Sequence, residues 1–209
     1  SNQIYVIPNG GDYNIVLKEN KSSMINVLFL ANLLETKGVF DVIQSALLLK
    51  PNQKIKYTLA GAWGDNDFKK KCLDLIKNNN LNVTILPPVS GKVKFDLLSE
   101  ASIFLFPPIA PEGHPWVLVE AMAANLPIIS TNQGAIVETV LNNENGFIVD
   151  INRTNIIKEK IELLSENLEL RERMSSKSRE IYENNFTEGI MVQNYSNVFN
   201  SIINSNLSK

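Results

Sequence analysis

The sequence has little of what marks several large classes of protein. It contains one cysteine, Cys72, so no internal disulfide can form and a quietly packed thiol is expected. Its 20 Lys and Arg nearly balance its 22 Asp and Glu, which gives no reason to expect a nucleic-acid partner. No apolar run approaches the ~20 residues of a membrane-spanning helix. We expect a soluble cytoplasmic domain, and peripheral association of the full-length protein with a membrane stays open.

What the sequence does contain is an alternation of two hydrophobic periods. Of its 209 residues, 44% are hydrophobic, which is enough for one sizeable core. Short β-branched runs alternate with segments of helical period, and the pattern after Asp150 is wholly helical. This predicts an α/β, Rossmann-like three-layer domain with extra C-terminal helices. The runs expected to form a six-stranded parallel sheet, with helices on both faces, are 27–31, 55–60, 83–86, 103–106, 128–130 and 147–149.

The stretch richest in chemistry covers residues 107–122. It begins at the end of the fourth run and enters a helix near Pro115, a residue suited to a first helical turn. Ligands of open α/β sheets bind at such carboxyl ends of strands. The N–H groups of residues 116–118 are expected to form an anion site together with the helix dipole. Gly113 permits a close approach between backbone and ligand.

Seven residues separate the two glutamates of this stretch, Glu112 and Glu120. One of them could therefore reach a sugar ring while the other reaches a ribose diol. Glu120 lies within a long apolar run, where burying an unpaired carboxylate would be unfavourable. A solvated loop residue and an exposed helix residue are the plainer interpretations of the two side chains.

Two other loops follow predicted strands. Lys37 stands at a helix start, where its charge opposes the helix dipole, so an anionic group nearby would explain it. A surface lysine without a partner is the commoner case. In the loop of residues 87–91, Ser90 could cap the next helix, and the backbone could bind a base.

Taken together, the three loops resemble the C-terminal domain of retaining glycosyltransferases that have two Rossmann-like domains, the GT-B fold. The closest resemblance is to the group 1 family, also called family 4. Its hallmark is two glutamates with seven residues between them, as Glu112 and Glu120 have here. The further matches are Ala121-Met122-Ala123, the Pro127-led strand, Gly134, Glu138, residues 145–149, and a hinge into the second domain at residues 6–10.

The resemblance implies a role for each matching residue. Glu120 would bind the ribose hydroxyls, Glu112 would meet the transferred sugar as the catalytic residue, and Lys37 would bind the diphosphate. Asn32 stands where the family usually has Arg, so one bidentate diphosphate contact is lost. The other donor-binding residues that the resemblance implies are Gly38, Val89, Gly113, His114, Pro115, Trp116 and Val117.

Two features invite a stronger interpretation than they support. His114, the only histidine, matches a backbone-contact position of the family, so we expect no proton-transfer role. Asp65-Asn66-Asp67 mimics the metal-binding motif of a different glycosyltransferase fold, but it precedes a helix that Asp65 or Asp67 could cap. We therefore expect no metal site and no cofactor, with a nucleoside diphosphate sugar as donor substrate.

The function that the resemblance implies is retaining transfer of a hexose from a nucleoside diphosphate sugar. Residues 1–209 would be one nucleotide-sugar-binding domain, the acceptor would bind to an N-terminal domain outside this sequence, and the isolated chain would be inactive. A glycoside hydrolase, a sugar-nucleotide epimerase of similar fold and a non-enzymatic interaction module stay open. A dehydrogenase is disfavoured because no G-x-G-x-x-G follows the first run.

The last predicted helix, residues 187–205, carries an apolar stripe. Members of the family that the chain resembles often pack this helix on the N-terminal domain. The stripe is therefore expected to be partly exposed here and to drive non-native dimers. It consists of Tyr195, Val198, Phe199 and Ile202.

Overall fold

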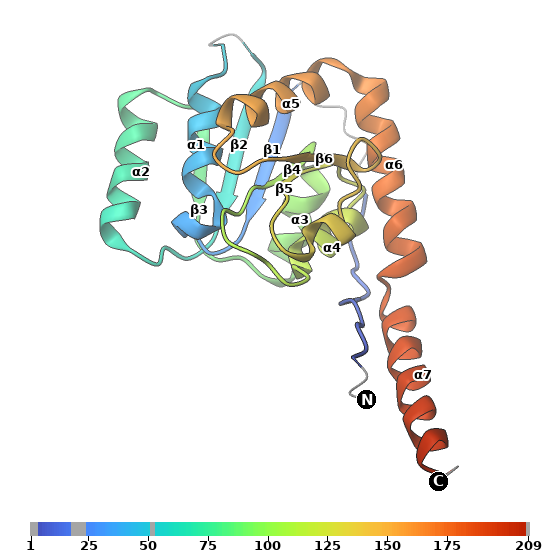
Figure 1. The fold of residues 1–209 in the computed structure, drawn as a ribbon. Helices are drawn as coiled ribbons and strands as arrows, with labels where there is room; N and C mark the ends of the chain where they lie inside the picture. The colour runs from blue at the N-terminus through green and yellow to red at the C-terminus, as the bar shows by residue number, and fades with distance from the viewer. Residues whose placement is uncertain (1–3, 18–23, 51–52, 208–209) are drawn as a thin grey trace.

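The computed structural model describes residues 4–17, 24–50 and 53–207, and these form a parallel sheet with helices on both faces (Figure 1). The strands are β1 (Ile25–Leu30), β2 (Ile55–Ala60), β3 (Val83–Leu86), β4 (Ile103–Phe106), β5 (Ile128–Thr131) and β6 (Gly146–Val149). Their order across the sheet is β3-β2-β1-β4-β5-β6, and every pair is parallel. This is the strand order of a Rossmann fold, as the sequence pattern predicted.

Seven α-helices and two short 3₁₀ turns connect and extend the strands of the described chain. Right-handed crossovers place α1 and α2 on one face and α3 and α4 on the other. The helix α1 also packs against α5, and α4 packs against α6. The helices are α1 (Val39–Leu47), α2 (Asn66–Asn78), α3 (Gly91–Glu100), α4 (Trp116–Ala123), α5 (Thr154–Glu166), α6 (Leu168–Asn185) and α7 (Glu188–Leu207), and the turns are η1 (Glu35–Lys37) and η2 (Ala135–Glu138).

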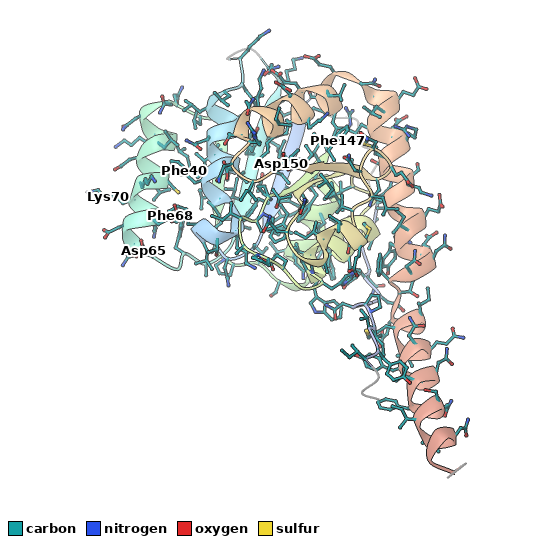
Figure 2. The ribbon with its side chains drawn as sticks, viewed as in Figure 1. Phe40, Asp65, Phe68, Lys70, Phe147 and Asp150 are labelled. Atoms are coloured by element: carbon teal, nitrogen blue, oxygen red, sulfur yellow. The ribbon has the colours of Figure 1, made fainter. Side chains whose placement is uncertain are left out.

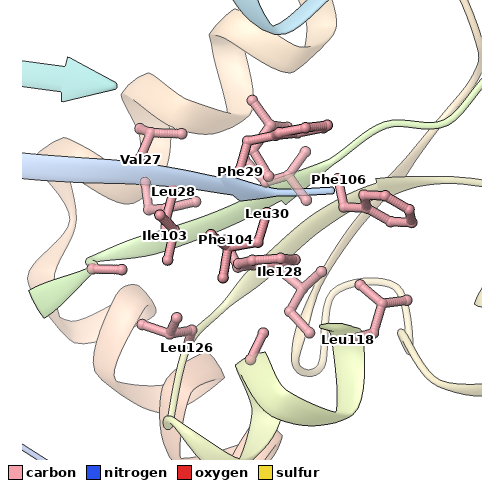
Figure 3. Packing of buried hydrophobic residues seen from close by; sticks show 14 of the residues in the cluster. Val27, Leu28, Phe29, Leu30, Ile103, Phe104, Phe106, Leu118, Leu126 and Ile128 are labelled. Carbon is pink, nitrogen blue, oxygen red and sulfur yellow. The ribbon is translucent and has the colours of Figure 1, made fainter. Parts of the chain in front are cut away.

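The core lies on both sides of the two central strands, β1 and β4. Every residue of these strands is buried, because helices cover both faces. Figure 3 shows Leu28, Phe104 and Ile128 from three neighbouring strands packed together, with Leu118 of α4 and Leu126 closing over them. Burying a side chain of this kind contributes about 1.5–3 kcal/mol. The centre of the sheet is therefore a rigid base for the loops that leave it.

Several local expectations are confirmed and one is wrong. Cys72 is buried in α2, and burial raises the pKa of its thiol to about 11, as fits a packed rather than a reactive cysteine. Asp65 caps α2, since its carboxylate accepts from the N–H of Phe68 at 2.6 Å. Ser90 stands at the cap position of α3, but its side chain makes no capping hydrogen bond.

The last helix, α7, projects away from the sheet, and the first described residues run beside its base (Figure 1). The N–H of Gly11 donates to the carbonyl of Phe186 at 3.0 Å, and the N–H of Glu188 donates to Asp12 at 3.1 Å. Further along α7 the apolar side chains are exposed, with Phe199 at 60% and Tyr195 at 45%. The predicted exposure of this stripe is confirmed.

Candidate functional site

The candidate site lies at the carboxyl ends of β1 and β4. Chain connections run away from these two neighbours in opposite directions, which makes the gap between their ends the switch point where ligands of such sheets bind. The loop after β1 carries Asn32 and Lys37, and the loop after β4 carries Glu112 and His114. The topology thus brings together the two loops that the sequence singled out separately.

Backbone contacts fix the β1 loop against the β4 loop. The N–H of Ile109 donates to the carbonyl of Thr36 at 3.0 Å. Gly38 adopts a left-handed conformation with φ of 78°, and a Cβ at this position would come within 1.9 Å of the carbonyl oxygen of Pro107. Only glycine permits this approach, because any side chain would collide with backbone. Lys37, the residue before it, is thereby held beside the β4 loop.

Lys37 and Glu112 form an ion pair across the two loops. The distance from Lys37 Nζ to Glu112 Oε1 is 2.5 Å, and the two side chains are 27% and 15% exposed. The sequence suggested an anionic group near Lys37, and in this structure that group is Glu112. The two residues that the resemblance assigns to the diphosphate and to the sugar therefore contact each other directly.

The backbone of Glu112 is held independently of its side chain. Glu112 and Gly134 form a parallel β-bridge, and the N–H of Ala135 donates to the carbonyl of Glu112 at 3.0 Å. Gly134 has φ of 65°, and a Cβ there would lie 1.9 Å from the same carbonyl oxygen. The loop before η2 thus supports the glutamate from behind, a role for Gly134 that the sequence did not reveal.

Glu120 lies in the second turn of α4 and is buried, as its apolar neighbours in the sequence suggested. Its carboxylate accepts a hydrogen bond from Lys94 of α3, which forms an ion pair with it. The two side chains are 9% and 25% exposed. Sequence analysis missed Lys94, because a lysine in a short helix normally indicates a solvated face and nothing local points to a carboxylate 26 residues away.

Lys94 and Glu120 line a pocket of about 290 Å³ at the carboxyl ends of the strands, whereas Lys37 and Glu112 are not among its lining residues. Pro88 and Val89 line it from the β3 loop, and Asn32 and Gly61 from the β1 and β2 loops. The remaining lining residues are Leu30, Ala31, Ala60, Trp116 and Val117. Of the predicted site residues, this pocket brings together Asn32, Val89, Trp116, Val117 and Glu120.

The turn into α4 has the geometry of an anion site, with one correction to the expectation. Pro115 occupies the cap position, and the N–H of Leu118 donates to its carbonyl at 3.0 Å, so that N–H is used within the helix. The N–H groups of Trp116 and Val117 lie in the first turn and have no acceptor within the helix. Nothing lies within 4 Å of a Cβ placed on Gly113, which leaves this turn open to a ligand.

His114 contributes its backbone to the site while its ring is packed away. Its carbonyl accepts from the side chain of Asn9 at 2.7 Å, which ties the N-terminal segment to this turn. Its ring lies 5.0 Å from that of Phe186, and neither ring nitrogen has a hydrogen-bond partner within the described structure. Burial lowers the pKa of the imidazole, with Glu138 opposing the shift. The side chain is thus a neutral packing group in this structure.

The described residues bring together no cluster of three or more His, Cys, Asp and Glu side chains that could hold a metal ion. Asp65 lies at the start of α2, on the outer side of the molecule beside Phe68 (Figure 2). Its capping bond gives the Asp-x-Asp sequence a structural role. Among the helices of the described segments, none is long and apolar enough to cross a membrane.

Comparison with known proteins adds to this geometry. A family model for glycosyl transferases group 1 matches residues 17–181, which is most of the chain. The chain belongs to the group 1 glycosyltransferases. Over 201 residues this domain is 27% identical to the capsular polysaccharide biosynthesis glycosyltransferase CapM of Staphylococcus aureus, covering 94% of the chain and 52% of CapM. The chain spans about half the length of the curated relatives it matches.

Two solved structures show how this group 1 domain relates to known folds. Anabaena HepE in complex with UDP and glucose matches with a TM-score of 0.79 and 21% identity, over 86% of this chain and 49% of HepE. The C-terminal domain of a group 1 family protein, LpcC from Francisella tularensis, matches with a TM-score of 0.70 and 22% identity, over 79% of this chain and 87% of that domain. At these identities the likeness confirms the predicted Rossmann-like fold and no more.

Proposed function

We propose that this chain is the donor-binding, C-terminal domain of a retaining family 4 hexosyltransferase. In the full-length enzyme it would hold a nucleoside diphosphate sugar while an N-terminal domain holds the acceptor. Family membership, the match to about half the length of CapM and the likeness to an isolated C-terminal domain support this assignment. HepE, whose fold is similar, was solved with UDP and glucose.

One observation carries the proposal: a cation, two carboxylates and a helix start converge at the switch point of the sheet. Lys37 contacts Glu112, and Glu120 lines the adjoining pocket together with Trp116 at the start of α4. A nucleoside diphosphate sugar needs these groups, because it presents a ribose diol and a transferred sugar to the carboxylates and a diphosphate to the cation and the helix start. Glu120 would accept hydrogen bonds from the ribose hydroxyls, and Val89 would meet the base through its backbone.

The proposed chemistry requires charge stabilisation at the departing diphosphate. The bond between the anomeric carbon and the β-phosphate oxygen breaks, and the electron pair leaves with the diphosphate. Lys37 and the first N–H groups of α4 would stabilise that charge as preorganised electrostatics. Glu112 would position the sugar, and positioning supplies a large part of many rate enhancements. Because Asn32 is uncharged, Lys37 carries more of this task than it would beside an arginine. We propose that no metal ion takes part.

The isolated chain is proposed to bind nucleotide and to transfer nothing, since one wall of the catalytic cleft is not in it. The exposed face of α7, with Tyr195 and Phe199, would pack on the N-terminal domain in the full enzyme. In the isolated chain the same face would form non-native dimers. Light scattering over a range of protein concentrations tests this, and a strict monomer throughout contradicts it.

Calorimetric titration of the chain with UDP, GDP and ADP tests the proposed function. We expect one of them to bind with a Kd between ~10 μM and ~1 mM, and Glu120→Ala to weaken that binding at least about tenfold. Glu166→Ala is the matched control, because Glu166 is exposed at the end of α5. EDTA should leave the affinity unchanged. No binding well above ~1 mM, or equal binding by the Glu120→Ala variant, would contradict the proposal.

A further inference from the structure

The strongest feature without a role so far is the ion pair of Lys94 with Glu120. It joins two helices, and Lys94 contacts one carboxylate oxygen, Oε1. A carboxylate has two oxygens with about four lone-pair sites, so this contact uses only part of its capacity. Both residues line the pocket at the strand ends. The pair therefore belongs to the wall of the site rather than to the scaffold behind it.

The surroundings of Lys94 hold its ammonium group in one place. Its Nζ lies 5.7 Å from the centre of the Phe95 ring and forms an ion pair with Glu120. Lys92, two residues earlier on α3, gives the contrast. It is 85% exposed and pairs with Asp96 at 2.6 Å within its own helix. A surface pair of that kind contributes about 0–1 kcal/mol to stability. A partly buried pair between two helices instead holds its two side chains in one relative orientation.

A group of aromatic side chains lies near the ion pair of Lys94 and Glu120. Tyr13 lies near it, and the Tyr13 hydroxyl is buried without a hydrogen-bond partner in the described structure. The centre of the Tyr13 ring lies 6.3 Å from that of Phe95 and 6.2 Å from that of Tyr182. Burial, followed by the charge of Glu120, raises the pKa of Tyr13. Lys94 is then the only cation that the described structure pairs with Glu120.

We propose that Lys94 is a positioning residue that makes this site select ribose over 2′-deoxyribose. The inference rests on the proposed function, in which Glu120 binds the ribose hydroxyls. By holding Oε1, Lys94 fixes the carboxylate so that its other oxygen faces the pocket in one orientation. A vicinal diol can satisfy a fixed carboxylate with its hydroxyl donors, whereas a 2′-deoxyribose lacks one of them. Sites built to hydrogen-bond a hydroxyl reject the analogue that lacks it.

The experiment compares the tightest-binding nucleoside diphosphate with its 2′-deoxy analogue, for example UDP with 2′-deoxy-UDP, by calorimetry on the 209-residue chain. The unaltered chain should prefer the ribonucleotide about 10- to 100-fold, the range of one hydrogen bond to a charged group. Lys94→Met should reduce this preference to within about threefold, mainly through weaker ribonucleotide binding. Lys94→Arg should retain most of the preference, and Lys92→Met should retain all of it.

The outcomes separate this inference from the proposed function. A chain that binds no nucleoside diphosphate overturns both. A chain that binds, and whose ribose preference survives Lys94→Met with both affinities lowered equally, overturns only the role of Lys94, since the lysine would then act as a general positive charge. Lys94→Ala, which likewise removes the donor, supplies the same comparison if Lys94→Met does not fold. Circular dichroism and urea unfolding check the fold of each variant.

Discussion

The two lysine–glutamate pairs at the carboxyl edge of the sheet use the same residue types but come from different elements. Lys37 and Glu112 lie in loops that meet at the switch point, and their side chains are 27% and 15% exposed. Lys94 and Glu120 lie on two helices, and the carboxylate is only 9% exposed. A pair on helices keeps one geometry, whereas loop side chains can part when a ligand arrives. We therefore regard the first pair as exchangeable and the second as fixed.

The backbone behind the exchangeable pair offers the largest test of this contrast. Gly134→Ala should lower the free energy of unfolding by about 3 kcal/mol, because the new Cβ would lie 1.9 Å from the Glu112 carbonyl oxygen at a positive φ. Gly113→Ala, in the β4 loop next to Glu112, is the control and should change the free energy of unfolding by less than about 0.5 kcal/mol, since nothing lies within 4 Å of its added Cβ. Urea unfolding measures both. Similar losses would mean that the loop does not need its support at Gly134.

Removing the cation of each pair should separate the pairs by stability. Lys94→Met leaves a buried carboxylate without its partner and should lower the free energy of unfolding by about 2 kcal/mol. Lys37→Met leaves a carboxylate that water can reach, and the loss should stay below about 1 kcal/mol. Urea unfolding of the two variants side by side makes the comparison. A larger loss of unfolding free energy for Lys37→Met than for Lys94→Met would mean that the Lys37–Glu112 pair is the fixed one.

Removing the carboxylate of the exchangeable pair should strengthen diphosphate binding. Glu112→Gln frees Lys37 and removes a negative charge, and UDP carries no transferred sugar that would lose a contact with Glu112. We expect UDP affinity to rise about three- to tenfold, or roughly 1 kcal/mol. Glu120→Gln should lower it instead. Calorimetry in low salt measures the change in affinity. The change should be smaller at about 0.3 M salt, roughly twice the physiological ionic strength, because salt screens the attraction between Lys37 and the diphosphate. Weaker UDP binding by Glu112→Gln would show that the pair does not compete with the ligand.

Acidification should have the smallest effect on the free energy of unfolding, and it should act through His114 in the β4 loop. Burial lowers the pKa of His114 in the folded state, so the unfolded state binds more protons once the pH falls below its ordinary value of about 6.5. Stability should therefore fall as the pH drops through that range and recover as it rises. The slope should lie well below the one-proton limit of about 1.4 kcal/mol per pH unit, because the charge of Glu138 opposes the lowering of the pKa. Urea unfolding between pH 7 and 5.5 should show a smaller slope for His114→Phe, and an unchanged slope would assign the effect elsewhere.

Local patterns in the sequence were enough to predict the sheet and the positions of the loops. The predicted strands match the observed ones to within two residues, because strands buried on both faces require continuous apolar runs. The burial of Glu120 followed in the same way from its apolar neighbours. The predicted anion site included the N–H groups of residues 116–118. The N–H of Leu118 donates to the carbonyl of Pro115 instead, so only those of Trp116 and Val117 are available to a ligand.

What the sequence by itself determined is the order of strands and helices and the placement of Lys37, Glu112 and Glu120 at or near strand ends. Only the tertiary structure decided which charges meet. Glu112 pairs with a lysine 75 residues away, and Glu120 pairs with Lys94, 26 residues away on another helix. These partnerships depend on the direction of each crossover and on the close approach of Gly38 to Pro107, and neither leaves a periodic trace in the chain. Hydrophobic periodicity records which face of an element is buried, but it does not record which neighbour lies against that face.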